Sequence, residues 1–145
     1  MFGRIVKLWS QLSRADPPVL SARNLAGIDL GGTNLARADL RSADLRRTNL
    51  SGVILAQADL RDANLSEAYL LYARLQAADL RNASLRGADL QGADAREADL
   101  RGADLSEARV DGATFTGARM LHGDAQRCAL TPEQRRSIIL HEPAE

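Results

Sequence analysis

Apolar residues recur along this chain at a spacing of five. When residues 21–120 are written in groups of five, the last position of each group is Leu in 16 of 20 groups. The position two residues earlier is Ala in 15 groups, and the position between them is Asp or Asn in 13. On an α-helix such leucines would spread around every side, and on a flat strand they would alternate between faces. The spacing therefore predicts neither regular element.

Within each group, the pattern is that of a short piece of strand. Ala and Leu lie two residues apart and share one side, while the polar residue between them points away. Three extended residues followed by a two-residue corner would curl the chain into a solenoid with a Leu and Ala interior. Glycine occupies the second corner position in eight groups and suits a bend with positive φ. A different turn type is expected at the corners that hold Arg47, Asp62, Glu67 and Glu97.

The repeated unit, Ala-Asp-Leu-Arg-Xaa and its variants, runs from Arg23 to His122 and covers 100 of 145 residues. This motif resembles the pentapeptide-repeat family. The resemblance implies an all-β fold, a right-handed quadrilateral parallel β-helix with four pentapeptides in each coil. About five coils are then expected.

A coil of four pentapeptides would bring charged side chains into columns on one face. Aspartates and arginines would form two adjacent ladders of opposite charge, at Asp39, Asp59, Asp79 and Asp99 and at Arg41, Arg61, Arg81 and Arg101. We interpret this as a solvated, ion-paired face rather than a cation site. The same spacing would stack Phe115 on Ala95, where a leucine is missing from the interior.

The N-terminal segment, residues 1–20, predicts a helix that caps the solenoid and a proline linker. One helical face would carry Phe2, Ile5, Val6, Trp9 and Leu12. Pro17 and Pro18 would end the helix. The alternative is a membrane-surface helix, which three basic residues support only weakly.

The C-terminal segment, residues 126–145, predicts a second capping helix after the repeats of residues 21–125. Thr131 is placed as its N-cap and Pro132 as its first residue. The helix would carry Ile138, Ile139 and Leu140 and end before Pro143. Because members of the family commonly pair end to end there, the alternative is a homodimer formed through this helix.

Composition excludes several classes of partner and compartment. Basic and acidic residues balance at 19 each, so no overall charge would draw the chain to nucleic acid or an anionic membrane. Cys128 is the single cysteine, which excludes an intrachain disulfide and favours a reducing compartment. Neither a signal peptide nor a membrane-spanning stretch is recognisable. We expect a cytoplasmic protein.

Motifs of catalysis are weak in this sequence. Residues 28–34 resemble the phosphate-binding turn of sugar kinases with the actin-like ATPase fold, but Asp29 and Leu30 occupy their repeat positions and the chain is too short for such a kinase. His122 and His141 lack metal-site spacing. A filled apolar interior with flat outer faces offers no pocket for chemistry. We therefore expect no enzyme, no cofactor and no metal.

One repeat departs from the polar outer surface. Tyr69, Leu71 and Tyr72 are expected to point outward around a buried leucine, with Ile54 and Arg74 at the rim. Exposed aromatic and arginine residues are typical of interface hot spots, although drift on a tolerant surface is the competing interpretation. The sequence thus favours a rigid protein-interaction module whose protein partner is unidentified.

The alternative function is that of a DNA-mimicking, gyrase-binding protein, as in the quinolone-resistance relatives. Mimicry of a duplex requires a dense acidic surface. The repeats hold 15 acidic and 13 basic residues, in alternation, so this alternative is less favoured.

Overall fold

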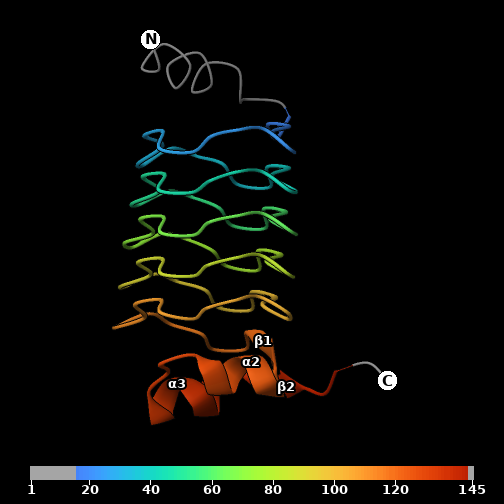
Figure 1. Ribbon diagram of the computed structural model, residues 1–145, viewed down its shortest axis with the longest axis vertical. Coiled ribbons are helices and arrows are strands. Elements are labelled where there is room, and N and C mark those ends of the chain that lie inside the picture. Colours follow the sequence, from blue (N-terminus) through green and yellow to red (C-terminus); the bar gives the residue numbers. More distant parts are fainter. Residues whose placement is uncertain (1–15, 144–145) are drawn as a thin grey trace.

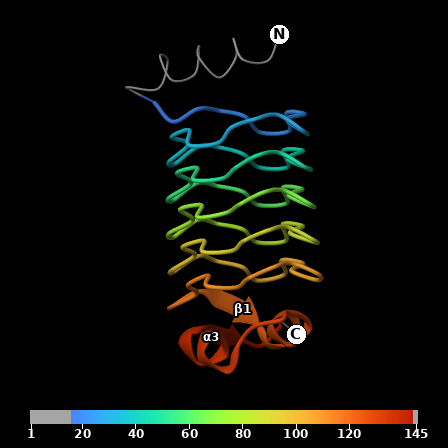
Figure 2. The same cartoon turned by 90° about the vertical axis from the view of Figure 1, so that its left-hand side faces the viewer.

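The computed structural model describes residues 16–143. Successive turns of the chain stack along the long axis of the molecule (Figures 1 and 2). The described residues begin at Asp16. The helix predicted for the N-terminal segment, with Phe2 and Trp9 on its apolar face, therefore lies outside them. No helix among residues 16–143 is long and apolar enough to cross a membrane.

Neighbouring turns pair through parallel backbone bridges at a constant offset of four pentapeptides. The bridges run from Val19↔Asp39 to Asp99↔Arg119. In a typical rung, the N–H of Leu40 donates to the carbonyl of Asp59 at 2.8 Å, and the N–H of Asp59 donates to the carbonyl of Ala38 at 2.9 Å. Each turn therefore has four short extended edges and four corners, as the family resemblance implies.

All corners in the repeats share one backbone conformation. At each corner, the residue after the turn donates to the carbonyl three positions before it, as Ala43 does to Leu40 at 3.1 Å. The second corner residue has positive φ whether it is glycine or not, with 55° at Arg47, 60° at Asp62 and 58° at Glu67. The expectation of a different turn type at non-glycine corners, Glu97 included, is wrong. Bridges to the turns on both sides impose the left-handed conformation against local preference.

The interior is a continuous column of Leu and Ala. Leucines from Leu40 to Leu85 are almost completely buried, and the alanines two positions before them are equally inaccessible. Phe115 is 2% exposed, and the Asp94↔Thr114 bridge places it in the turn next to Ala95, as expected. Thr48 is a buried polar residue in this column, and its hydroxyl donates to the carbonyl of Leu25 at 2.8 Å.

The C-terminal end differs from its prediction. It consists of β1 (Arg119–Leu121), α2 (His122–Arg127), α3 (Pro132–Ser137) and β2 (Ile139–His141). The boundary predicted at 125/126 falls inside α2, which the repeat pattern did not indicate.

Helix α3 begins as predicted but ends earlier. Thr131 is its N-cap and forms a capping box with Gln134, and Pro132 is its first residue. The helix ends at Ser137, and Ile138 is its C-cap. The prediction that the helix carries Ile138 is therefore wrong, and so is the same prediction for Ile139 and Leu140. These residues form β2, which pairs in parallel with β1 at the same offset as the repeats, because the backbone edge of β1 offers hydrogen bonds that a continued helix could not use.

Buried side chains attach this end to the repeats. Ala125, Cys128 and Leu130 join the apolar core. The side-chain amide of Gln134 donates to the carbonyls of Val110 and Ala113 at 2.8 and 3.0 Å. The last turn therefore has hydrogen-bonding partners on its C-terminal side.

Candidate interaction site

The five residues singled out by the sequence lie on and beside one corner of the solenoid, and we call this group the corner patch: Tyr69, Leu71, Tyr72, Ile54 and Arg74. Tyr69 and Tyr72 are 53% and 72% exposed, Arg74 is exposed, and Leu71 and Ile54 are half-buried. Ile54 and Arg74 are bridged directly in neighbouring turns. Tyr69 lies on the edge before the corner and Arg74 on the edge after it, so the patch wraps one corner of the solenoid.

Tyr72 occupies a backbone position that glycine fills in each of the other turns. Its φ is +54°, and the corresponding residues of the other turns are Gly32, Gly52, Gly92 and Gly112. The ring lies over Gly92, since a Cβ added there would be 2.5 Å from two ring carbons. The expectation that flanking glycines leave this ring uncovered holds only in part: Tyr72 is largely exposed, but one side of its ring lies against Gly92.

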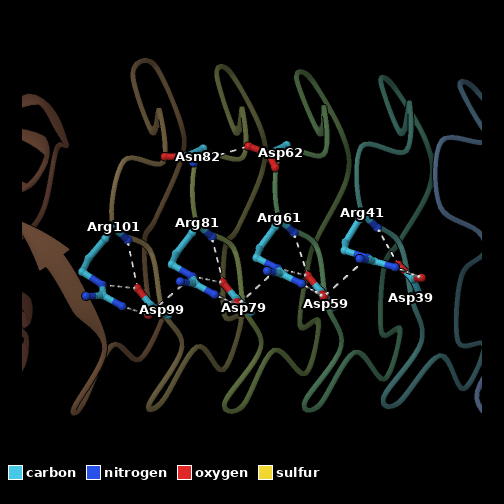
Figure 3. Close-up of polar contacts among 10 residues, drawn as sticks. All are labelled: Asp39, Arg41, Asp59, Arg61, Asp62, Asp79, Arg81, Asn82, Asp99 and Arg101. Carbon is cyan, nitrogen blue, oxygen red and sulfur yellow. Dashed lines mark hydrogen bonds and ion pairs between the residues drawn. The ribbon is translucent and has the colours of Figure 1, made fainter.

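The predicted charged ladders are present on another corner (Figure 3). Within each turn, an aspartate accepts two hydrogen bonds from the guanidinium two residues later. For Asp59 and Arg61, the Nε–Oδ1 and Nη2–Oδ2 distances are 2.8 and 2.6 Å. The backbone N–H of Arg61 also donates to Oδ1 at 3.2 Å. The aspartate and arginine of each Asp-Leu-Arg sequence therefore bind each other and stabilise the corner in which they lie.

The ladder also extends from turn to turn. Arg41 Nε lies 3.8 Å from Asp59 Oδ2, and the equivalent distance from Arg61 to Asp79 is 3.6 Å. Arg81 approaches Asp99 at 4.0 Å. Each of these arginines thus lies between two carboxylates, as the adjacent ladders predict.

The ladder changes the acidity of its carboxyl groups. Hydrogen bonds from Arg41 lower the pKa of Asp39 to about 2 from its ordinary value of 3.8. Hydrogen bonds from Arg61 lower the pKa of Asp59. Burial alone would raise the pKa of Asp99, but the hydrogen bonds from Arg101 outweigh it and the pKa is lowered. These aspartates remain charged at neutral pH and are neutralised by arginines of the same chain.

Three other features of residues 16–143 bear on catalysis or metal binding. A hollow of about 400 Å³ is lined by Arg46, Arg47, Ser66 and Glu67, but Arg47 and Glu67 pair with each other at 2.8 Å. Among residues 16–143, no group of three His, Cys, Asp or Glu side chains could hold a metal ion. Burial raises the pKa of the Cys128 thiol to about 11, which disfavours the nucleophilic thiolate.

Sequence reasoning missed two features of the corner patch. The contact between Tyr72 and Gly92 follows from the turn register and the ring conformation, and the residue pattern does not specify the ring conformation. The hydrogen bonds that Arg96 and Gln76 donate to Asp94, the bridged neighbour of Arg74, were missed because they depend on side-chain conformations that the residue pattern does not specify.

The family model described as pentapeptide repeats matches residues 20–57, 43–82 and 83–121, with eight copies of the repeat. A pentapeptide-repeat protein, Rfr23, from the cyanobacterium Cyanothece 51142 is 29% identical and has a TM-score of 0.73. That match covers 81% of this chain and 95% of the cyanobacterial chain. The two proteins therefore share a fold over most of their length.

Two further solved structures are more distant in shape. A pentapeptide-repeat protein of the Arabidopsis thaliana thylakoid lumen is 30% identical over 81% of this chain and 74% of that one, with a TM-score of 0.49. QnrB1, a plasmid-mediated fluoroquinolone resistance protein, is 21% identical over 85% of this chain and 64% of that one, with a TM-score of 0.48. A comparison with curated protein sequences finds no match.

Proposed function

Because this chain belongs to the pentapeptide-repeat family, whose members form right-handed β-helices, we propose that it is a non-enzymatic protein-interaction module. About five coils, closed at both ends by capping segments, would form a rigid rod that presents the corner patch to a protein partner. The observation that carries this proposal is the exposure of Tyr69 and Tyr72 at one corner of a surface otherwise dominated by short polar and ion-paired side chains.

Rigidity is the mechanism of this proposal. The patch lies on backbone that is hydrogen-bonded to the turns on both sides: the N–H of Tyr69 donates to Thr48, and the N–H of Tyr72 donates to Gln91. Little backbone freedom would be lost on docking, so more of the contact energy would appear as affinity. The interior is filled by Leu and Ala, which leaves no room for a catalytic cavity inside the described part of the rod.

The gyrase-binding alternative is less well supported by the surface. A mimic of duplex DNA must expose uncompensated negative charge along its length. Here the aspartates of the ladder are each bound by an arginine of the same turn, as for Asp39 with Arg41 and Asp99 with Arg101. A supercoiling assay at stoichiometric protein distinguishes the two proposals, since only the mimic would inhibit or protect gyrase.

The corner patch is tested by comparing wild type with Tyr69→Ser/Leu71→Ser/Tyr72→Ser. The bound protein is identified by cross-linking and mass spectrometry, and its affinity is then measured with purified components. We expect the triple variant to bind at least about 30-fold more weakly, because aromatic anchors typically contribute about 2 kcal/mol or more each.

A matched control carries three substitutions on a neighbouring corner, Ala56→Ser/Gln57→Ser/Ala77→Ser. It should bind like wild type, and circular dichroism should show all three proteins equally folded. Equal affinity of wild type and the patch variant would reduce the corner patch to surface drift.

Two finer parts of the proposal concern assembly and location. Ile139 and Leu140, both about half exposed, lie on the edge strand β2, so we expect any homodimer to involve this strand rather than a helix. Sedimentation velocity of Ile139→Ser/Leu140→Ser against wild type tests this. A cytoplasmic site of action rests on the single, buried Cys128.

A further inference from the structure

Arg74 differs from the other arginines of the central turns in its pairing. Ten arginines are found from Arg41 to Arg109. Nine of them have a carboxylate oxygen of the described residues within 4.0 Å, namely Arg41, Arg46, Arg47, Arg61, Arg81, Arg86, Arg96, Arg101 and Arg109. Arg74 has none among residues 16–143, although its side chain is exposed within the corner patch.

The register of the turns explains this difference. Arg74 is bridged to Ile54 in the preceding turn and to Asp94 in the following turn. Ile54 carries no charge, and Asp94 is already held by Arg96 at 2.8 and 2.7 Å and by the Gln76 amide at 2.7 Å. A carboxylate saturated in this way has little left to offer a third donor.

Arg109 shows what the same kind of position does when a carboxylate is available. It also lies on an outward edge, and it is bridged to Asp89 in the preceding turn. Its Nη1 lies 3.2 Å from Asp89 Oδ2. At the equivalent place in the turn before Arg74 stands Ile54, which offers no carboxylate to pair with.

We propose that the corner patch recognises a protein segment that carries a carboxylate beside apolar side chains. The carboxylate binds the guanidinium of Arg74, and the apolar groups pack on Tyr69, Leu71 and Tyr72. This inference rests on the proposed interaction function and adds the chemistry of the partner. Arginine suits the role because its planar donors bind a carboxylate through two hydrogen bonds, and exclusion of water by the tyrosines strengthens that pair.

The partner chemistry is tested by selecting peptides from a phage-displayed random library on immobilised wild-type protein. Clones that also bind Tyr69→Ser/Leu71→Ser/Tyr72→Ser are removed. We expect the retained peptides to share an Asp or Glu within a few residues of aromatic or aliphatic side chains. Arg74→Gln should weaken synthetic versions of these peptides about 10-fold, the equivalent of one charge-assisted contact. Arg37→Gln, an exposed arginine on another corner, should leave their affinity unchanged.

A second pair of variants separates charge from shape at Ile54. Ile54→Asp places a carboxylate where Asp89 stands beside Arg109, so it should pair with Arg74 and compete with the peptide. Ile54→Asn removes the same apolar surface without adding charge. We expect Ile54→Asp to bind about 5-fold more weakly than Ile54→Asn, and the gap to close in the Arg74→Gln background.

The outcomes distinguish the two levels of the proposal. If no peptide depends on the tyrosines, the proposed interaction site is wrong. If peptides depend on the tyrosines but lack acidic residues, or bind Arg74→Gln as tightly as wild type, only the acidic partner is overturned.

Discussion

Two opposite corners of the solenoid use their side chains in different ways. At the ladder corner, residues 41–42, 61–62, 81–82 and 101–102, each arginine is bound by an aspartate of its own turn. The patch corner lies ten positions further along the turn. Its second position is glycine in four turns and Tyr72 in the middle one of the five. One corner completes its contacts within the chain, and the other leaves an aromatic ring and a guanidinium facing solvent.

The difference shows how a repetitive fold can separate stability from recognition. The backbone of both corners is the same, with left-handed second residues and parallel bridges between equivalent positions of adjacent turns. Only the outward side chains differ, and they are not constrained by the Leu and Ala interior. Substitutions at the two corners should therefore affect different properties.

The largest effect should come from the interior that both corners share. Phe115→Ala would leave a cavity beside Ala95 and lower the free energy of unfolding by about 3–5 kcal/mol. Urea denaturation followed by circular dichroism measures this. Phe115→Leu, which keeps most of the volume, should cost less than about 2 kcal/mol. A loss of under about 1 kcal/mol for the alanine variant would contradict the packing described for Phe115.

A smaller effect, confined to the ladder corner, should follow acidification. A carboxyl whose pKa is lowered on folding stabilises the folded state above its unfolded pKa, and this contribution is lost as pH falls through the folded pKa. For Asp39 these values are 3.8 and about 2. The pKa values of Asp44, Asp59 and Asp94 are lowered in the same direction by their arginines. The midpoint of thermal unfolding should thus be constant above about pH 5 and fall between about pH 4 and pH 2.

A ladder variant supplies the control for this pH dependence. Asp39→Asn/Asp59→Asn should be less stable than wild type at pH 7 and should lose less stability on acidification. Equal pH profiles for the two proteins would show that the ladder does not contribute. The patch variant of Tyr69, Leu71 and Tyr72 should keep the wild-type profile.

The smallest effect should be a gain in stability at the patch corner. Tyr72→Gly relieves a left-handed conformation that costs a side chain about 1 kcal/mol, while the exposed ring loses little buried surface. We expect the free energy of unfolding to rise by about 0.5–1 kcal/mol, and partner binding to fall. Tyr72→Ala keeps a Cβ at positive φ and should not gain stability. A Tyr72→Gly protein that is less stable than wild type would mean that the ring supports the fold.

The fold was predictable because its interior repeats. Leu and Ala at fixed spacing specify the extended edges and the corners. The turn of four pentapeptides, which the family resemblance implies, brings Asp59 near Arg41, whereas the pairing of Asp59 with Arg61 is local to one turn. The turn type at Arg47 or Asp62 was not predictable from local preference, because hydrogen bonds to adjacent turns impose positive φ on any residue there.

The C-terminal end was less predictable for the same physical reason. Ile139 and Leu140 follow a helix in sequence, but the open edge of β1 recruits them as a strand. Helix α2 has six residues, including Gly123. Such a short helix does not show a helical period in its sequence. For Arg74, the residue pattern indicates which residues are its neighbours in adjacent turns. It does not indicate that one of them, Asp94, is already hydrogen-bonded to Arg96.

The pairing of Arg119 with Ile139 has a consequence for how such a chain changes length in evolution. Inward-facing apolar residues recur every five residues. Gain or loss of one pentapeptide would therefore still place an apolar residue at every inward position. The contacts between neighbouring turns, and the pairing of β1 with β2, instead join residues that are four pentapeptides apart. A single pentapeptide inserted between Arg74 and Asp94 would rotate every later column by one edge, breaking the ladder and separating Arg74 from Asp94. Viable relatives should therefore differ in length by whole turns wherever their outer columns are under selection.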